Sequence, residues 1–494
     1  MKNWIKPNGA LLSMIVLAWL PGRVLSAAPP ATAPATRSET QPAGPEVERI
    51  ILHPSATTQP ALQYKLLPDP LDETPGNAAM LYATAVDLLP TAPPGKPLEE
   101  LWERVDDTPF VDALSPEQLA HDAKTEAILQ KCAEALRRVD AAARCQDVDW
   151  DAALRELGFD ATMSYLNHLR HFANILRLKY RFQMARGDLS GALRSMQTSF
   201  SMAVQLNRRP VLVEGLVAAG VSELVLDRGV EEWVGLDHSP NLYWALSSLP
   251  RPYFNYPAMA HTEQAAIYFQ FPALRAAARG EELSAEQWRQ IMLELMRLNV
   301  GYEPVASRPP DLGIWLNQVV ASALPKSREY LLSIGTPKEK LPGIAPEQAV
   351  GVYFFHEYRV ASDEIWKAWE LPYLQSIELM RGADERFGAK RVNDNPFLGG
   401  VVWLNIWRAK FHFTHLDRRV AMYRTLEALR NHLALHGGLP DRLDEITDVP
   451  VPIDPFTDKP FSYRREGRTA VLEALASNVA NPSTGQRFEI TVAK

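Results

Sequence analysis

The stretch that decides the fold is residues 166–204, which read LNHLRHFANILRLKYRFQMARGDLSGALRSMQTSFSMAV. On both sides of Gly187-Asp188 the large apolar side chains recur at spacings of three and four, and this period places them on one face of a helix. A Gly-Asp pair favours a turn between two such helices. The stretch therefore predicts an antiparallel helical hairpin.

Helices are predicted over most of the chain on both sides of this hairpin. Ser115 stands before Pro116 and three residues before Gln118, which is a capping box that begins a helix. Ser284 and Gln287 form a second such box. The hairpin has no second copy at the period of a tetratricopeptide repeat. We therefore expect a mainly α protein with an irregular or solenoid-like helical body, with helices at 77–89, 115–138, 211–226, 345–369 and 396–435.

The end of the chain changes character after His436. Two glycines end the long helix, and short alternating patterns then predict strands. The long helix has one apolar stripe that should pack on a small antiparallel sheet, and Phe461 and Tyr463 should face the same side of their strand. The predicted strands are 461–464, 470–473 and 488–492, and the stripe consists of Val420, Tyr423, Leu426, Leu429 and Leu433.

The first 26 residues have the pattern of a secretory signal peptide. Lys2 and Lys6 precede an apolar run at 10–20, and small residues follow up to Ser26. The run is shorter than the about 20 apolar residues that a membrane-spanning helix needs. We therefore expect the mature chain to be exported, periplasmic or extracellular, and soluble, with no transmembrane segment.

Composition divides the rest of the chain into three segments. Residues 27–62 are rich in Ala, Pro and Thr, and this composition predicts a disordered tether, in which residues 47–67 can contain a short extended segment. Residues 63–395 are predicted to form a helical domain. Residues 396–494 are predicted to form the module of a long helix and a small antiparallel sheet.

Charge and cysteine content limit the partners and the covalent structure. The net charge of −7 gives no overall attraction to nucleic acid, and we expect no nucleic-acid partner. One helix across both cysteines would hold Cys132 and Cys145 about 20 Å apart, too far for a disulfide. A bridge would need a turn near residues 141–143, so we favour free thiols over a bridge.

A resemblance to a known family is found in the tail. Residues 436–467, HGGLPDRLDEITDVPVPIDPFTDKPFSYRREG, resemble the globular end of the major pseudopilin of type II secretion. In that family a helix leads into a Gly-x-Pro turn, a Leu-rich segment and an Asp-Pro-aromatic-Gly run that ends in a Tyr strand. The resemblance covers residues 418–465 and implies an α+β fold for the tail. The matching residues are Gly438, Pro440, Leu443, Asp454, Pro455, Phe456, Pro460 and Tyr463.

The same comparison sets limits on what the resemblance implies. The pseudopilin calcium loop uses acidic side chains, whereas residues 474–485, ALASNVANPSTG, contain no carboxylate. The chain begins with an ordinary signal sequence instead of a prepilin-peptidase site. The resemblance therefore implies the fold of the tail, but neither filament assembly nor calcium binding. The whole chain resembles a group of uncharacterised exported bacterial proteins of planctomycete type, and that likeness implies no activity.

Histidines offer the first candidate chemistry. An i,i+4 pair places two imidazoles on one helix face, as in helical zinc sites, but no third ligand and no His-Glu-x-x-His motif accompanies any pair in the sequence. His432 and His436 also stand in the last turn of a helix, where positive charge complements the helix dipole. We therefore favour capping or packing and expect no tightly held metal. The pairs are His168/His171, His412/His415 and His432/His436.

Carboxylates and aromatic residues offer two further candidates. Glu214 and Glu223 stand in the most apolar predicted helix, where burial can raise the pKa of a general acid. Because they are nine residues apart, they lie on opposite helix faces, and we expect them to face solvent or to form salt bridges. The aromatic stretch at 252–271 can line a groove for a sugar or a peptide, but we favour a place in the core.

These observations leave two classes of function. We assign no catalytic, cofactor-binding or metal-ligating residue and expect no cofactor. The chain contains no nucleophile elbow, no phosphate-binding glycine loop and no lytic-transglycosylase motif. We expect an exported non-enzymatic helical protein that binds another protein or a cell-envelope component. The alternative is an envelope hydrolase that acts on glycan or peptide with residues that the sequence does not identify.

Overall fold

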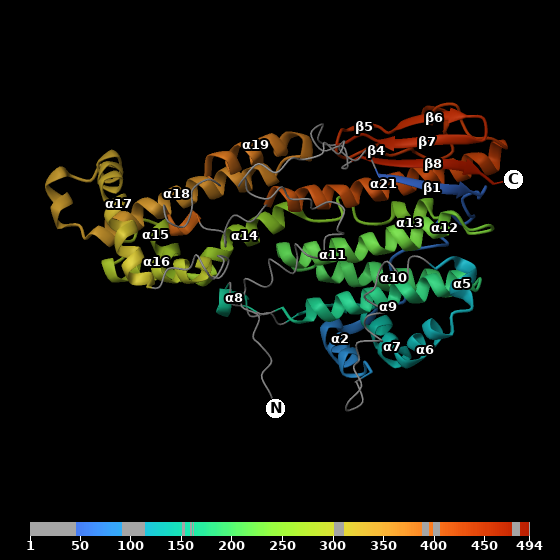
Figure 1. Cartoon of the computed structure of the whole chain (residues 1–494), viewed down its shortest axis with the longest axis horizontal. Helices are drawn as coiled ribbons and strands as arrows, with labels where there is room; N and C mark the ends of the chain where they lie inside the picture. The colour runs from blue at the N-terminus through green and yellow to red at the C-terminus, as the bar shows by residue number, and fades with distance from the viewer. Residues whose placement is uncertain are drawn as a thin grey trace, which may run out of the picture. The chain divides into compact units, whose positions relative to one another are not determined.

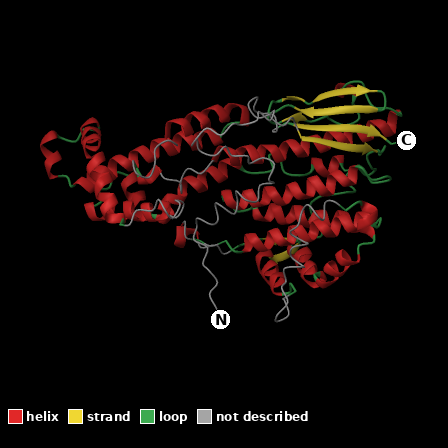
Figure 2. Cartoon of the chain, in the orientation of Figure 1, coloured by secondary structure: helices red, strands yellow, loops and turns green. Residues whose placement is uncertain are grey.

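A computed structural model of the chain describes residues 46–90, 114–150, 154–158, 161, 163–300, 311–387, 395–398, 406–476 and 485–493. The predicted signal peptide at 1–26 and residues 27–45 of the predicted tether lie outside this part. The described chain is mainly helical and ends in a long helix followed by a small sheet, as predicted (Figure 1, Figure 2). Among the described helices, none combines the length and the apolar character that a membrane span requires.

The described residues form two compact units. The described residues of the helical unit fall within Ala152–Thr162 and Asn255–Phe411, and those of the sheet unit fall within Ala18–Asp151, Met163–Phe254 and His412–Lys494. The division predicted from the sequence has its boundaries after residues 26, 62 and 395. The tail groups with helices before residue 255 because it shares a core with them; for example, the rings of Phe254 and Phe413 lie 4.4 Å apart.

The core of the helical unit is built around Trp288. Gly351 lies so close to this indole that a Cβ at position 351 would be 2.5 Å from the ring, and only glycine fits there. Ser284 and Gln287 form the predicted capping box at the start of α16. The elements of this unit are α8 (Leu154–Leu157), α14 (Tyr256–Gln270), α15 (Pro272–Ala278), α16 (Ala285–Val300), α17 (Leu312–Ser333), η4 (Lys338–Gly343), α18 (Pro346–Trp369), α19 (Tyr373–Phe387) and η5 (Pro396–Leu398).

The predicted hairpin lies in the sheet unit and is confirmed. Gly187 adopts a φ of +76°, a conformation that glycine reaches without strain. Asp188 then caps the second helix by accepting a hydrogen bond from the backbone N–H of Gly191 at 2.9 Å. The helices of this unit are α2 (Ala78–Asp87), α5 (Pro116–Ala120), α6 (Ala123–Lys131), α7 (Ala133–Ala142), α9 (Tyr165–Ala185), α10 (Leu189–Leu206), α11 (Leu212–Val225), η2 (Leu226–Val230), α12 (Glu231–Val234), α13 (Tyr243–Ser247), α21 (Ile406–His436, in this unit from His412) and η6 (Leu443–Glu445).

The single helix predicted at 115–138 is wrong, although its capping box is present. The segment folds as α5, α6 and α7, because Asp122 caps a new helix by accepting from the N–H of Thr125 at 2.9 Å. Cys132 lies at the break between α6 and α7, and Cys145 begins β3 (Cys145–Asp147), which pairs with β2 (Thr74–Asn77). Both cysteines are buried free thiols, as favoured from the sequence.

The three strands predicted from the sequence pair antiparallel as expected, and a fourth strand, β1, makes the tail sheet mixed. Strands β8, β7 and β6 pair antiparallel, and β1 pairs parallel to β8 at the edge, which gives the order β1-β8-β7-β6 (Figure 1). The strands are β1 (Glu46–Leu52), β6 (Ser462–Glu466), β7 (Thr469–Ala474) and β8 (Gln486–Val492), and β4 (Ile453–Asp454) pairs separately with β5 (Lys459–Pro460).

Strand β1 matches the short extended segment expected within residues 47–67. The sequence EVERIIL alternates, so that Ile50 and Leu52 are buried while Val47, Arg49 and Ile51 are exposed. Burial of these two large aliphatic side chains stabilises the strand.

Helix α21 packs on the sheet as predicted, and every residue of its predicted apolar stripe is buried. The ring of Tyr423 lies 5.6 Å from that of Phe488 on β8. Phe461 and Tyr463 lie on the opposite side of their strand from the exposed Ser462, which confirms the predicted alternation. Tyr463 is only half-buried, and its hydroxyl donates a hydrogen bond to the carbonyl of Pro440 at 3.1 Å.

Candidate functional site

Two groups of polar side chains in the sheet unit have the composition of functional sites. The first, called the Arg419 cluster, gathers four carboxylates and a tyrosine around one guanidinium. The second, called the His–Asp group, joins two imidazoles and one carboxylate at the end of α21. The Arg419 cluster comprises Glu48, Glu223, Asp227, Glu231, Arg419 and Tyr423, and the His–Asp group comprises His432, His436 and Asp448.

Three sequence-distant segments build the Arg419 cluster. Arg419 and Tyr423 stand one turn apart on α21, and Glu48 is on the inward face of β1. The other carboxylates come from the segment that runs from α11 through η2 into α12. Because α21, β1 and η2 each contribute buried residues to the core of the unit, the side chains of the cluster have a fixed backbone position.

A π-helical turn aligns the three carboxylates that come from one segment. Glu223, Asp227 and Glu231 follow each other at intervals of four, and in a regular α-helix residues eight apart drift by about 80° around the axis. The wider turn of η2 between them opposes this drift and returns Glu231 toward the face of Glu223. Such turns occur often at functional sites, because they place a side chain that a regular helix would misdirect.

Arg419 connects the members of the cluster directly. Its guanidinium lies 3.2 Å from Glu48 Oε1 and 2.5 Å from Asp227 Oδ1, and it donates to the Tyr423 hydroxyl at 2.9 Å. Gln486 on β8 also donates to Glu48 Oε1, at 3.2 Å. Arg419 is 5% exposed and Glu48 13%, whereas Asp227 is 36% exposed and forms the open side of the cluster.

Two carboxyl groups of the cluster have a raised pKa. Burial raises the pKa of Glu223 to about 8, and the negative charge of Asp227 adds to this effect while Arg419 opposes it. Burial likewise raises the pKa of Glu231, with Glu48 as the strongest repelling neighbour. The neutral form of both glutamates is therefore favoured beside the ion pairs of Arg419. Glutamates with a raised pKa can serve as proton donors.

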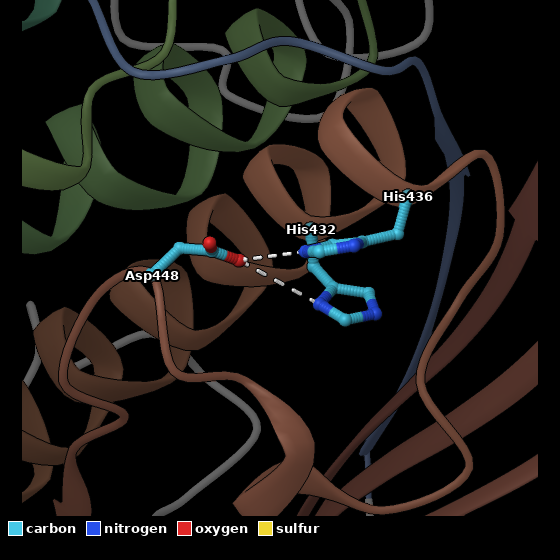
Figure 3. Close-up of side chains that lie close together, drawn as sticks. All are labelled: His432, His436 and Asp448. Carbon is cyan, nitrogen blue, oxygen red and sulfur yellow. Dashed lines mark hydrogen bonds and ion pairs between the residues drawn. The ribbon is translucent and has the colours of Figure 1, made fainter.

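The His–Asp group lies where α21 ends (Figure 3). His436 Nε2 is 3.1 Å from Asp448 Oδ2, and His432 Nδ1 is 3.8 Å from the same oxygen. In the described part of the chain, this is the group of three such residues whose ligand atoms all lie within 4.8 Å of one another. Burial lowers the pKa of His432, and the neighbouring His436 lowers it further, so the neutral imidazole is favoured.

The sequence indicated one helical pair of this group but not its third member. His432 and His436 are visible as an i,i+4 pair, whereas Asp448 lies in the loop between η6 and β4 and has no local signal. The two other predicted pairs are not part of a convergent group among the described residues. Burial lowers the pKa of His168, and it lowers the pKa of His415 far below its ordinary value.

The two glutamates of the apolar helix α11 are both buried, so of the two expected arrangements, solvent-facing or salt-bridged, they do not adopt the first. Glu214 accepts hydrogen bonds from the Tyr165 hydroxyl and from Arg209, so the salt-bridged alternative holds for it. Glu223 belongs to the Arg419 cluster. The two residues lie in different polar environments, consistent with the expectation that they cannot form a catalytic pair.

The aromatic stretch at 252–271 contributes to the cores of both units. Tyr253 and Phe254 are buried in the sheet unit, and Phe271 is buried in the helical unit. The Tyr253 hydroxyl is 3.0 Å from the Ser222 hydroxyl, which satisfies a buried polar group on α11. This agrees with the core role that we favoured for the stretch.

Comparison with known proteins adds no further assignment: no family model matches the chain, and neither a curated protein nor a solved structure is significantly similar to it.

Proposed function

We propose that the chain is an exported, non-enzymatic helical protein that binds another protein or a cell-envelope component through the outer face of β1. The observation that carries this proposal is the exposure of Val47 and Ile51, 46% and 57%, on an edge strand. Exposed apolar side chains on a sheet edge are typical of surfaces that add an extended segment of a partner. The signal-peptide pattern of residues 1–26 supports export.

The Arg419 cluster supports this role by anchoring β1. Its Glu48 contacts Arg419, while the next inward residues, Ile50 and Leu52, are buried. On the outer face, Arg49 forms an ion pair with Glu489 of β8 at 3.2 Å. The strand is therefore fixed from its inner face, and its outer apolar side chains remain available.

The tail provides the scaffold for this surface in the proposal. Two of the residues that carry the pseudopilin resemblance, Asp454 and Tyr463, contact Arg418 at the middle of α21 and Pro440 after its end. These contacts hold β4 and β6 against α21 and the segment that follows it.

The test compares the mature chain (residues 27–494) with the double variant V47K/I51K in co-sedimentation with isolated cell envelopes. We expect the bound fraction to fall roughly 10-fold, because two lysines remove the apolar contact. The matched control is I314K/I334K in the helical unit, where the replaced side chains are 60% and 55% exposed.

Circular dichroism and thermal melting establish that both variants keep the fold. Loss of binding in V47K/I51K but not in I314K/I334K supports the proposal. Equal binding by all three proteins, or an equal loss in the control, contradicts β1 as the binding surface.

A second candidate function, an envelope hydrolase, is favoured by the Arg419 cluster. Burial raises the pKa of Glu231, and the exposed Asp227 lies on the open side of the same cluster. A glutamate with a raised pKa near a second, more exposed carboxyl group is an arrangement used for general acid–base catalysis on glycans and peptides. Release of soluble fragments from purified cell walls by the wild type, lost in Glu231→Gln and retained in Glu489→Gln, would favour the hydrolase over the binding protein.

A further inference from the structure

The His–Asp group combines the donor atoms of a transition-metal site in a rigid setting. His432 is 12% exposed and His436, the last residue of α21, is 51% exposed. Asp448 lies between Ile446 and Val449, which are both buried and fix its loop against the unit. One side chain of the group is therefore held inside the protein, and the opposite side is open to an ion from solvent.

The spacing of the three donor atoms fits one small ion. A tetrahedral ion with bonds of about 2.0–2.1 Å separates its ligand atoms by about 3.3 Å. The distances from Asp448 Oδ2 to His436 Nε2 and to His432 Nδ1 are 3.1 and 3.8 Å. All three donor atoms lie within 4.8 Å of one another, so small side-chain movements would bring them into a metal's coordination sphere.

A second set of two histidines and one aspartate in the same unit provides a comparison for the geometry of the His–Asp group. His53 Nδ1 lies 3.3 Å from Asp237 Oδ1, and His238 Nε2 lies 3.2 Å from Asp237 Oδ2. The two imidazoles contact opposite oxygens of one exposed carboxylate, whereas His432 and His436 contact the same oxygen of Asp448 (Figure 3). Both sets contain two histidines and one aspartate, but only in the set at Asp448 do both imidazoles point to the same carboxylate oxygen.

We propose that His432, His436 and Asp448 bind one divalent transition-metal ion of the Zn²⁺ class. Two imidazole nitrogens and one carboxylate oxygen suit Zn²⁺ and Cu²⁺, whereas Mg²⁺ and Ca²⁺ prefer sites made of oxygen alone. Three protein ligands leave one position for water or for a ligand of another molecule. The expectation of no metal rested on the missing third ligand, and Asp448 supplies it.

The charges around the site are balanced. Glu445 and Arg465 both act on His432 electrostatically, with opposite sign. Arg465 is paired with Asp441 at 2.9 Å, which reduces its repulsion of a cation. Once bound, the ion would join the loop that leads into β4 to the end of α21, and it would therefore stabilise the folded state by linkage.

The experiment titrates ZnCl₂ into the tag-free mature chain after chelator treatment, by isothermal calorimetry. We expect one Zn²⁺ per chain, with affinity reduced roughly 10-fold or more in Asp448→Asn, which replaces an anionic carboxylate with a weaker neutral amide ligand, and in His436→Ala, which removes an imidazole. The matched control is Asp237→Asn at the second histidine–aspartate set. Co²⁺ provides an independent readout, because its visible absorption reports nitrogen and oxygen ligands in tetrahedral geometry.

The outcomes separate a metal site from a structural ion pair. Stoichiometric binding that is lost in Asp448→Asn and His436→Ala, and kept in Asp237→Asn, supports the proposal. Absence of Zn²⁺ binding by the wild type overturns it. Undiminished binding in both site variants also overturns it, even if their melting temperatures fall, because the His–Asp group is then only an ion pair.

Discussion

Arg418 of α21 and Asp454 of β4 form a two-point ion pair that is almost entirely removed from water. Arg418 Nε lies 2.9 Å from Asp454 Oδ1, and its NH2 lies 2.8 Å from Oδ2, with 0% and 3% of the two side chains exposed. The same carboxylate accepts from the N–H of Phe456 at 2.9 Å, and the Phe456 ring lies 4.0 Å from the guanidinium. The Asp-Pro-Phe run is therefore the turn that aims the chain back along the helix.

The first prediction concerns this pair. Asp454→Asn should lower the free energy of unfolding by about 3–5 kcal/mol, because it leaves a buried guanidinium without a counter-charge. Replacing both residues with apolar ones, R418M/D454L, should cost less than the single change, since no buried charge is left alone. Urea denaturation measures both. Glu489→Gln, in the exposed pair with Arg49, is the control and should cost less than about 1 kcal/mol.

The second prediction concerns Tyr463 at the join between sheet and helix. Tyr463→Ala should cost about 3 kcal/mol, because it removes a large aromatic side chain from the contact with the helix end. Tyr463→Phe should cost about 1 kcal/mol, the contribution of its hydrogen bond to Pro440. Thermal melts give both values. If Tyr463→Ala melts like the exposed-site control Arg464→Ala, the packing of this strand on the helix end is not what stabilises the tail.

The third prediction is a dependence of stability on pH. Glu223 has a pKa of about 8 in the folded chain against 4.5 for an ordinary glutamate. Between these values the folded state keeps a proton that the unfolded state has lost, so the free energy of unfolding falls as pH rises through this window. Below pH 4.5 both states are protonated and the effect vanishes.

Glu223→Gln keeps the neutral form at every pH and should reduce this loss by on the order of 3 kcal/mol between pH 5 and pH 8. Urea unfolding at pH 5, 6.5 and 8 measures the change. Glu489→Gln should leave the slope of the wild type intact. A Glu223→Gln slope equal to that of the wild type would show that the carboxyl group is ionised in the folded state.

The fourth prediction concerns the contribution of β1 to stability. Removal of residues 1–45 should leave the free energy of unfolding unchanged. Removal of residues 1–53 also removes β1, with its buried Ile50 and Leu52, and should cost about 4 kcal/mol or more. Chemical denaturation of the two shortened chains decides this. Equal stability would restore the longer tether that composition predicts.

Local signals in the sequence predicted local structure well. The capping boxes at Ser115 and Ser284, the Gly187-Asp188 corner and the stripe of α21 depend on residues within about one helical turn of each other. The break at Asp122 was missed because a capping aspartate within a helical pattern looks like an ordinary exposed residue. The parallel pairing of β1 with β8 has no local signal at all.

The candidate sites also combine residues that have a local sequence signal with residues that have none. His432 and His436 could be singled out by their spacing, but Asp448 comes from a loop whose course depends on the whole tail. Glu48 meets Arg419 across 371 residues of sequence, and Glu223 was noticed without the neighbours that raise its pKa. The sequence shows which residues can bind metal or carry charge, whereas only the tertiary fold shows which of these residues lie close together.

The parallel contact of β1 with β8 also fixes the order in which the sheet can be completed. Arg49 meets Glu489 across 440 residues, so the edge strand has no partner until the end of the chain is present. The pairing of β1 with β8 is expected to be slow, because closing so long a loop costs conformational entropy before the strand contacts form. During synthesis from the N-terminus, Ile50 and Leu52 therefore lack their sheet partner until β8 has been made, and β1 remains an unpaired strand over that time.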